Sequence, residues 1–382
     1  MNKLFVFFST FLDNEYTRSG GEIRLTKFAE FLKTKGYNCL TLKKKSFQTG
    51  NNIYLYFLLN LTLYPLISTY FFLKILRKSK NSSYLVLIPF THFGNDLLLG
   101  SLLKAILRIL LSKRILLIVY EQLPISFYRS LPAYKRRFID DLMIFNEKIG
   151  ITFAKNFADK IFILSNLDIK FFGLSKNYFL TTNSLLLKEI ESINRVRKRD
   201  LHERDIDFLY VARFVREKGV YDLDKILEYI NRVSHRKVSV VIVGRGPEFG
   251  RIKKEVERLK FKLDKVLVTF KGSVSDAEKY NLMSRSKILL YPSYADSFSY
   301  VILEARVFGL HIVAYALPSL LEKWKNGVTF VKIGSFHELA NTAMQKLKEI
   351  EEGLVTLTYH HPEITLEEIF INEIKEIFTS VT

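Results

Sequence analysis

The sequence predicts an α/β protein made of two doubly wound domains, and three observations predict it. Short, continuously apolar segments alternate with amphipathic helical segments, as in parallel sheets covered by helices on both faces. Nine or more such segments exceed one ordinary sheet. A polar stretch within 181–206 separates two groups of them. The predicted strands are 3–9, 37–42, 84–90, 114–120 and 160–165 in the first group, and 207–213, 238–244, 267–272, 287–293 and 311–316 in the second.

The first strand–helix–strand unit shows how the elements are assigned. KLFVFFS (3–9) is apolar throughout, and 23–35 follows with apolar residues at helical spacing. Gly36 ends that helix, because glycine readily adopts the left-handed conformation found after helix C-termini. YNCLTL (37–42) then resumes as a strand.

The same pattern sets the domain boundaries. We expect an N-terminal domain at 1–185, a second domain at 186–363, and a C-terminal helix within 364–382. That helix is amphipathic and begins Thr-Leu-Glu-Glu, which resembles a capping box.

Residues 53–73 contain no charged side chain and are long enough to span a bilayer. Pro65 interrupts the segment near its middle, and the segment occupies the position of a crossover helix between two strands. We therefore expect a buried or surface-docked helix, whose basic neighbour 74–80 favours attachment at a membrane interface.

Charge and cysteine content indicate the compartment and the partner. The net charge is +19, and residues 1–180 hold 26 Lys and Arg against 11 Asp and Glu, an excess of 15. Such asymmetry predicts that the first domain faces an anionic partner, either a membrane or a nucleic acid.

Cys39 is the single cysteine, which fits a reducing compartment, and the N-terminus resembles a strand rather than a signal peptide. We expect a cytoplasmic protein.

Two cations follow the first strand of the second domain. Arg213 ends YVAR, and Lys218 lies in the turn REKG. Open α/β sheets bind ligands at the carboxyl ends of their strands, so two cations there suit a diphosphate. They would also stabilise negative charge on a departing nucleoside diphosphate, which makes both residues candidates for catalysis.

Glycine-rich turns mark further candidate sites. Gly20 and Gly21 precede a predicted helix, where free backbone N–H groups attract phosphate. Gly244 and Gly246 lie in a strand-to-helix turn, where glycine permits close backbone approach.

Four motifs in fixed order carry a family resemblance. YVARFVREKGV, VIVGRGPE, VTFKGSVS and YPSYADSFSYVILEA together resemble the donor-binding half of retaining glycosyltransferases of the GT-B fold, glycosyltransferase family 4 (glycosyl transferases group 1). SGGEIR at 19–24 is similar to that family's N-terminal glycine-rich loop. The resemblance implies two Rossmann-like domains with a cleft between them, metal-independent transfer with retention, and a C-terminal helix that packs back toward the N-terminal domain.

The resemblance also implies roles for individual residues. Asp296 would face the donor sugar, and Glu304 would accept the ribose hydroxyls. The loop ending at Val274 would hold the base through its backbone, and Gly20 and Gly21 would close over the donor pyrophosphate. Backbone N–H groups at three further residues would point into the donor pocket: Ser297, Phe298 and Ser299.

The sequence departs from the family pattern at positions that would affect the specificity of the donor pocket and the supply of a catalytic base. Ser297 and Ser299 stand where glycines are usual, which would narrow the pocket, and the first acid is one methylene shorter. The family's histidine after the fourth N-terminal strand is absent. Glu121 would replace it as a hydrogen-bond acceptor or base, and His92 is a second candidate in the cleft.

Other constellations favour no alternative chemistry. Asp222 and Asp224 form a DxD sequence, but they begin a helix, where acidic residues are favoured. We expect neither a bound metal nor a cofactor.

The predicted function is a membrane-associated glycosyltransferase that uses a UDP- or GDP-type sugar and a glycan or lipid-linked acceptor, without a nucleic-acid partner. The alternatives are a nucleotide-sugar epimerase of GT-B fold, or a non-catalytic basic protein that binds membranes or nucleic acids.

Overall fold

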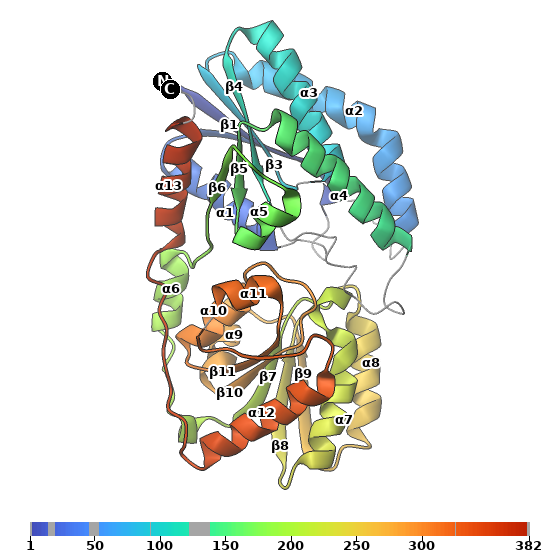
Figure 1. The fold of residues 1–382 in the computed structure, drawn as a ribbon, viewed down its shortest axis with the longest axis vertical. Coiled ribbons are helices and arrows are strands. Elements are labelled where there is room, and N and C mark those ends of the chain that lie inside the picture. The colour runs from blue at the N-terminus through green and yellow to red at the C-terminus, as the bar shows by residue number, and fades with distance from the viewer. Residues whose placement is uncertain are drawn as a thin grey trace. The chain divides into compact units, whose positions relative to one another are not determined.

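The computed structural model describes residues 2–13, 20–45, 53–91, 93–121, 138–324 and 326–379. It contains two six-stranded parallel sheets surrounded by helices, so the predicted α/β class with two doubly wound sheets is confirmed (Figure 1). The chain divides into an N-terminal unit, Met1–Thr182 with Glu367–Thr382, and a C-terminal unit, Asn183–Leu366. The first division thus falls after Thr182 rather than after residue 185.

The N-terminal unit holds its sheet in the order β2-β1-β3-β4-β5-β6. Five of these strands match predicted ones, and the short β6 is additional. The elements are β1 (Lys3–Asp13), α1 (Gly20–Thr34), β2 (Asn38–Lys45), α2 (Ile53–Ser79), β3 (Tyr84–Pro89), α3 (Gly94–Leu111), β4 (Arg114–Tyr120), α4 (Phe138–Phe157), β5 (Lys160–Ile163), α5 (Asn166–Phe172), β6 (Tyr178–Leu180) and α13 (Leu366–Thr379).

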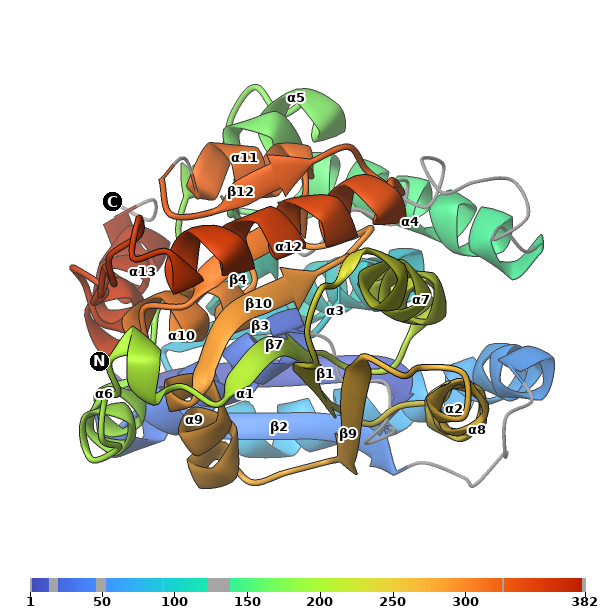
Figure 2. The same ribbon diagram turned by 90° about the horizontal axis from the view of Figure 1, so that it is seen from below.

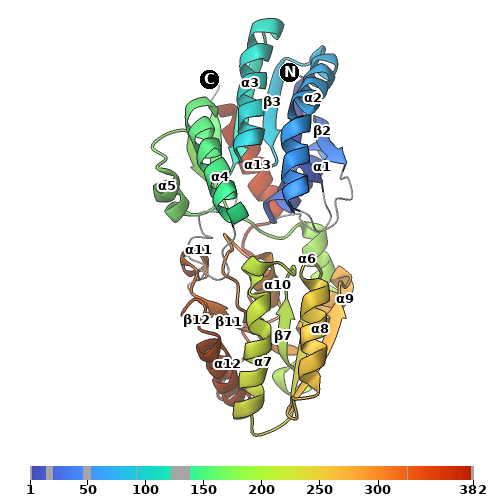
Figure 3. The same ribbon diagram turned by 90° about the vertical axis from the view of Figure 1, so that its right-hand side faces the viewer.

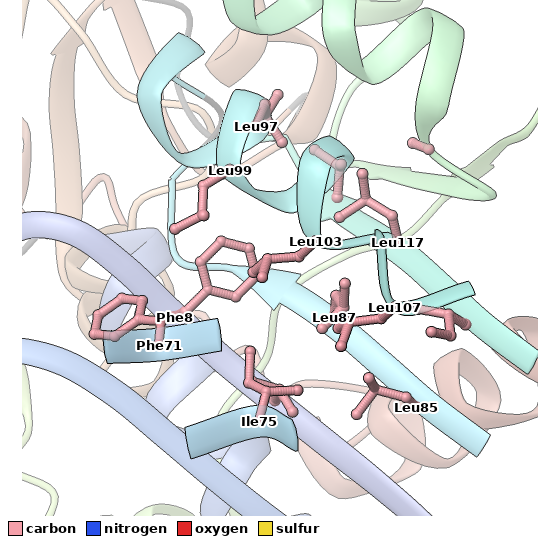
Figure 4. Packing of buried hydrophobic residues seen from close by; sticks show 14 of the residues in the cluster. Phe8, Phe71, Ile75, Leu85, Leu87, Leu97, Leu99, Leu103, Leu107 and Leu117 are labelled. Carbon is pink, nitrogen blue, oxygen red and sulfur yellow. The ribbon is translucent and has the colours of Figure 1, made fainter. Parts of the chain in front are cut away.

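Alternate residues of β1 pack against different helices. Leu4, Val6 and Phe8 join the cluster formed with α2, α3 and α4, in which Phe8 lies among side chains of α2 and α3 (Figure 4). Phe5 and Phe7 point to the other face of the sheet, because successive side chains of a strand alternate. There Phe7 meets α1, and Phe5 lies edge-on to a phenylalanine of α13, with ring centroids 6.1 Å apart. Two apolar faces explain why the strand is apolar throughout.

Helix α13 packs on the N-terminal unit by aromatic contacts and one buried ion pair. Phe370 lies 4.8 Å from the ring of Phe28 on α1. Glu373, fully buried, forms an ion pair with Arg24 and accepts a hydrogen bond from Tyr120 at 3.0 Å.

The uncharged segment predicted as a crossover helix is part of α2. This helix packs on the sheet through Ile67, Phe71 and Ile75, which recur every fourth residue. Helices α2, α3 and α4 lie side by side over this face (Figures 1 and 3). Within the described ranges, no helix combines the length and apolarity that a bilayer-spanning segment requires.

The C-terminal unit has the strand order β12-β11-β10-β7-β8-β9. All five predicted strands are present, and β12 is additional. Its elements are α6 (Leu187–Asn194), η3 (Leu201–Glu203), β7 (Ile206–Val211), η4 (Arg216–Lys218), η5 (Val220–Asp222), α7 (Leu223–Val233), β8 (Val238–Val243), α8 (Phe249–Lys260), β9 (Val266–Gly272), α9 (Asp276–Ser284), β10 (Ser286–Tyr291), α10 (Tyr300–Val307), β11 (His311–Tyr315), α11 (Pro318–Lys323), β12 (Thr329–Val331) and α12 (Phe336–Glu351).

The polar stretch expected to separate the domains belongs to the C-terminal unit. It forms α6, and Leu185 and Ile193 are almost completely buried. Few apolar residues, spaced on one face, are enough to attach so short a helix.

Candidate donor site in the C-terminal unit

The strand order of the C-terminal sheet reverses between β7 and β10. From β7 the chain proceeds outward through β8 and β9, and from β10 it proceeds the other way through β11 and β12. These two strands are neighbours in register, with Ile288 beside Phe208 (Figure 2). The loops after them therefore diverge at the carboxyl edge, the position at which open α/β sheets bind ligands.

Lys218 and Asp296 lie on the two sides of this reversal. The Lys218 ammonium donates to Asp296 Oδ2 at 2.6 Å and to the Ala295 carbonyl at 3.0 Å. Gly219 allows the approach, since its φ is +69° and a Cβ there would lie 1.8 Å from the Pro292 carbonyl oxygen. The structure thus brings together two predicted site residues that are far apart in the sequence.

The Asp296 carboxylate is engaged by its own loop. Oδ1 accepts the backbone N–H groups of Phe298 at 3.1 Å and Ser299 at 3.0 Å, and Tyr291 donates to Oδ2 beside Lys218. Burial opposes the charge, but Lys218, Tyr291 and the backbone donors together hold the pKa of Asp296 below its usual range. Two of the three N–H groups predicted to point into the donor pocket are therefore occupied by this carboxylate. A carboxylate one methylene shorter than glutamate reaches back to its own loop, and a sugar-facing role for Asp296 stays a prediction.

Ser299 adopts a conformation that favours glycine. Its φ is +67°, and its buried hydroxyl accepts the N–H of Ile302 at 3.2 Å to cap α10. The family's glycine at this position is thus explained by backbone conformation. Because the Ser299 side chain caps a helix, the structure favours a local structural role over the predicted narrowing of the pocket. Ser297 is partly exposed, and Phe298 is buried against Trp324.

Arg213 is the second predicted cation. Its guanidinium lies 3.2 Å from the Glu217 carboxylate and is about a quarter exposed, at 28%. Both predicted phosphate-binding cations therefore have acidic partners, Glu217 and Asp296, that an incoming diphosphate would replace or share.

Glu304 lies on α10 with a side chain only 8% exposed. Its Oε1 accepts from Lys279 at 2.7 Å and from the Tyr280 hydroxyl at 3.5 Å. Burial raises the pKa of Glu304, Lys279 offsets part of this, and the net shift remains upward. An acid near the start of a helix is usually solvated, whereas Glu304 is buried.

Gly244 and Gly246 make close contacts within their own unit. A Cβ on Gly244 would lie 1.9 Å from the Ala212 carbonyl oxygen, and one on Gly246 would lie 2.5 Å from that of Phe214. Their conformation and size are required by this packing, whether or not a nucleotide lies beside them. Val274 is partly exposed between β9 and α9.

The N-terminal candidates belong to the other unit. Gly20 and Gly21 are the first residues of α1, while residues 14–19 and His92 lie outside the described residues. Glu121 follows β4, is 6% exposed, and has both carboxylate oxygens buried without a hydrogen-bond partner in the described part of the chain.

Glu121 borders a cavity of about 20 Å³ that is otherwise lined by apolar side chains. Burial, followed by the charges of Asp168 and Glu147, raises its pKa well above the usual value. This environment favours the protonated, hydrogen-donating form and disfavours the predicted role as a base.

The first acid of the DxD sequence is occupied by internal contacts. Asp222 Oδ2 accepts hydrogen bonds from Tyr294 at 2.5 Å and Tyr315 at 3.0 Å, and Asp222 is buried. Asp224 Oδ1 is also buried, and it has no hydrogen-bond partner among the described residues.

Two residues near the site were missed by sequence reasoning, Tyr291 and Lys279. Tyr291 is the polar end of an otherwise apolar strand, which is a detectable signal. Lys279 has no such signal, since a lysine on a helix is ordinarily solvated.

Comparisons with known proteins agree with this description of the C-terminal unit. Residues 192–354 match the family model Glycosyl transferases group 1. The chain is 28% identical over 161 residues to an uncharacterized 41.2 kDa protein in the cps region of Klebsiella pneumoniae, covering 41% of this chain and 42% of that protein. It is 29% identical over 160 residues to the phosphatidylinositol N-acetylglucosaminyltransferase gpi3 subunit of Schizosaccharomyces pombe, covering 40% and 34%. The chain thus matches less than half the length of these curated relatives.

Solved structures resemble nearly the whole chain. Sucrose-phosphate synthase from Thermosynechococcus elongatus has a TM-score of 0.65 at 15% identity, covering 99% of this chain and 95% of that one. Anabaena HepE in complex with UDP-glucose has a TM-score of 0.62 at 16% identity, covering 99% and 96%. At such identities the likeness shows the fold. Residues 192–354 of the C-terminal unit are therefore similar to the glycosyl transferases group 1 family, and the chain has the GT-B fold.

Proposed function

We propose that the protein is a glycosyltransferase that moves a sugar from a nucleoside-diphosphate sugar to an acceptor hydroxyl with retention, without an essential metal. The observation that carries the proposal is the Lys218–Asp296 pair at the strand reversal of a group 1 domain. A cation there can bind a diphosphate, and the Lys218 side chain is 20% exposed.

The reaction breaks the bond between the anomeric carbon and the diphosphate oxygen and joins that carbon to the acceptor oxygen, whose proton passes to the departing diphosphate. Lys218 and Arg213 would stabilise the negative charge that grows on the departing diphosphate. Their partners Asp296 and Glu217 neutralise them until the donor binds. Glu304 would accept the ribose hydroxyls from its place on α10. The UDP-glucose bound to the structurally similar Anabaena protein supports a donor of this class.

The acceptor is proposed to be a lipid-linked or membrane-associated glycan. The relative from Schizosaccharomyces pombe is described as a subunit that acts on phosphatidylinositol, which supports a lipid acceptor. The basic excess of residues 1–180 suits an anionic surface.

The N-terminal unit exposes apolar side chains on two neighbouring helices. On α2 these are Leu66, Tyr70 and Leu73, spaced along one face, and α3 exposes Ile109 at 82%. Both helices are followed by a strand of one parallel sheet, so their basic C-terminal turns lie at the same sheet edge. Apolar rows that end in cations are typical of surfaces that lie on anionic lipid. We therefore propose peripheral attachment at the cytoplasmic face of the cell membrane through α2 and α3.

Product analysis tests the transfer reaction. The protein is incubated with UDP- and GDP-sugars and a membrane lipid extract, and free nucleotide and glycolipid are measured. Transfer predicts nucleoside diphosphate release with sugar in the lipid fraction, and loss of both in Lys218→Ala. Free sugar formed without acceptor would instead support the epimerase.

Vesicle flotation tests the attachment. We expect retention on phosphatidylglycerol vesicles, weaker retention on phosphatidylcholine, and loss in Ile109→Asp. Phe261→Asp is the matched control, because Phe261 is 94% exposed but lies in the other unit. Equal flotation of the two variants, or none by the unchanged protein, would contradict the membrane proposal.

A further inference from the structure

Lys279 places a cation directly beside the acid proposed to recognise ribose. Its Nζ lies 2.7 Å from Glu304 Oε1 and 3.0 Å from Asp276 Oδ1. Lys279 is 18% exposed and Glu304 is 8% exposed, whereas Asp276 is 75% exposed. The ammonium thus bridges a buried carboxylate and a solvated one.

The surroundings of Glu304 would otherwise disfavour its ionised form. Burial is the main influence that raises its pKa, and the acids Asp276 on α9 and Glu189 on α6 raise it further. Tyr280, also on α9, donates a long hydrogen bond of 3.5 Å. Lys279 is the group that lowers the pKa of Glu304, through charge and hydrogen bonding. Removal of this lysine leaves a buried carboxyl among acids, which would raise the pKa of Glu304 further.

We propose that Lys279 is a specificity-determining residue for the ribose of the donor: it keeps Glu304 ionised as an acceptor and itself supplies a donor to the ribose diol. The proposal rests on the assignment of Glu304 to ribose in the proposed function.

The two carboxylate oxygens of Glu304 have different partners in this proposal. Oε1 is held by Lys279, whereas no hydrogen bond to Oε2 is found among the described residues. One ribose hydroxyl can donate to Oε2 while its neighbour accepts from Nζ, so an acceptor and a donor face the vicinal diol together. A 2′-deoxyribose satisfies only half of this arrangement, and leaving a buried polar group without its partner is costly.

The test compares binding of UDP, GDP and their 2′-deoxy analogues by calorimetry between pH 6 and pH 8.5. For whichever base binds, the unchanged protein should prefer the ribonucleotide roughly tenfold or more, with little pH dependence. In Lys279→Met, ribonucleotide affinity should fall about tenfold at pH 6 and recover toward about threefold at pH 8.5, since one unit of pKa corresponds to a factor of ten. The preference over the deoxy analogue should shrink, and Lys279→Arg should restore both properties.

Lys346→Met is the matched control. Lys346 forms a comparable pair with Glu349 at 2.6 Å, but on α12. It should bind as the unchanged protein does. Should Lys279→Met fail to fold, Lys279→Gln keeps a neutral donor and should show the same pH-dependent loss.

The outcomes separate the two proposals. If the unchanged protein binds neither UDP nor GDP, the proposed donor site fails and Lys279 has no role in it. If binding is lost in Glu304→Gln but Lys279→Met keeps the pH profile and the ribose preference, the donor site stands and the role of Lys279 is overturned.

Discussion

Lys218 and Asp296 form an ion pair of 2.6 Å at the carboxyl edge of β7 and β10. The same two strands carry a second pair at their amino edge, where Lys287 lies 2.7 Å from Asp207. Both pairs are largely buried, but only the first lies where the strand order reverses.

These two Lys–Asp pairs provide a matched comparison for donor binding. Lys218→Ala should weaken nucleoside-diphosphate binding at least about tenfold, because the diphosphate loses a charged donor worth roughly 1.5–3 kcal/mol. Lys287→Ala should leave binding unchanged while it lowers stability, since the buried Asp207 loses one of its two cationic partners and keeps only Arg236. Binding is measured by calorimetry and stability by urea denaturation. Equal binding by both variants would contradict the donor site.

Asp296→Asn should destabilise the C-terminal unit by about 1–3 kcal/mol at neutral pH, because an amide cannot pair with Lys218. The pKa of Asp296 is lowered in the folded protein, so its stabilisation is present above the unfolded value, near 4, and is lost as pH falls through the folded pKa. The difference from the unchanged protein should therefore shrink below about pH 4. Denaturation at neutral and acidic pH measures it, and a pH-independent difference would indicate altered packing instead.

Glu121→Gln should stabilise the N-terminal unit at neutral pH. The pKa of Glu121 is raised by burial and by neighbouring acids, so the folded state retains a proton that the unfolded state releases above about pH 4. The advantage of glutamine should grow with pH by up to about 1.4 kcal/mol per unit until the folded pKa is reached. Glu30→Gln, on an exposed position of α1, is the control and should change nothing. A stability gain that is constant with pH would contradict this explanation.

Arg24→Met should cost about 3–5 kcal/mol, because it leaves Glu373 charged and fully buried. The double variant Arg24→Met/Glu373→Met should cost less than the sum of the single variants. Lys160→Met, which breaks a more exposed pair with Glu376 on the same helix, should cost about 1 kcal/mol or less. Unfolding by urea gives all four values, and strict additivity would argue against coupling between α1 and α13.

Local patterns in the sequence were sufficient for the ten main strands, because an apolar run flanked by turns needs only its neighbours to be recognised. The short strands β6 and β12 lack this signal, with three residues each, and pair only because a sheet edge is already present. The polar stretch around α6 was interpreted as a boundary because it contains few apolar residues. Those few residues are nevertheless enough to attach it.

The site was predicted only in part, because local patterns show where a side chain lies along the chain and not what it contacts. The sequence alone determined the doubly wound fold and the placement of Lys218 and Asp296 after strand ends. Only the tertiary structure decided what these side chains contact. Asp296 accepts hydrogen bonds from its own loop, and Glu304 is paired with Lys279. The Glu304–Lys279 and Asp296–Lys218 pairs join elements distant in the chain, so they arise only once the strands have come together.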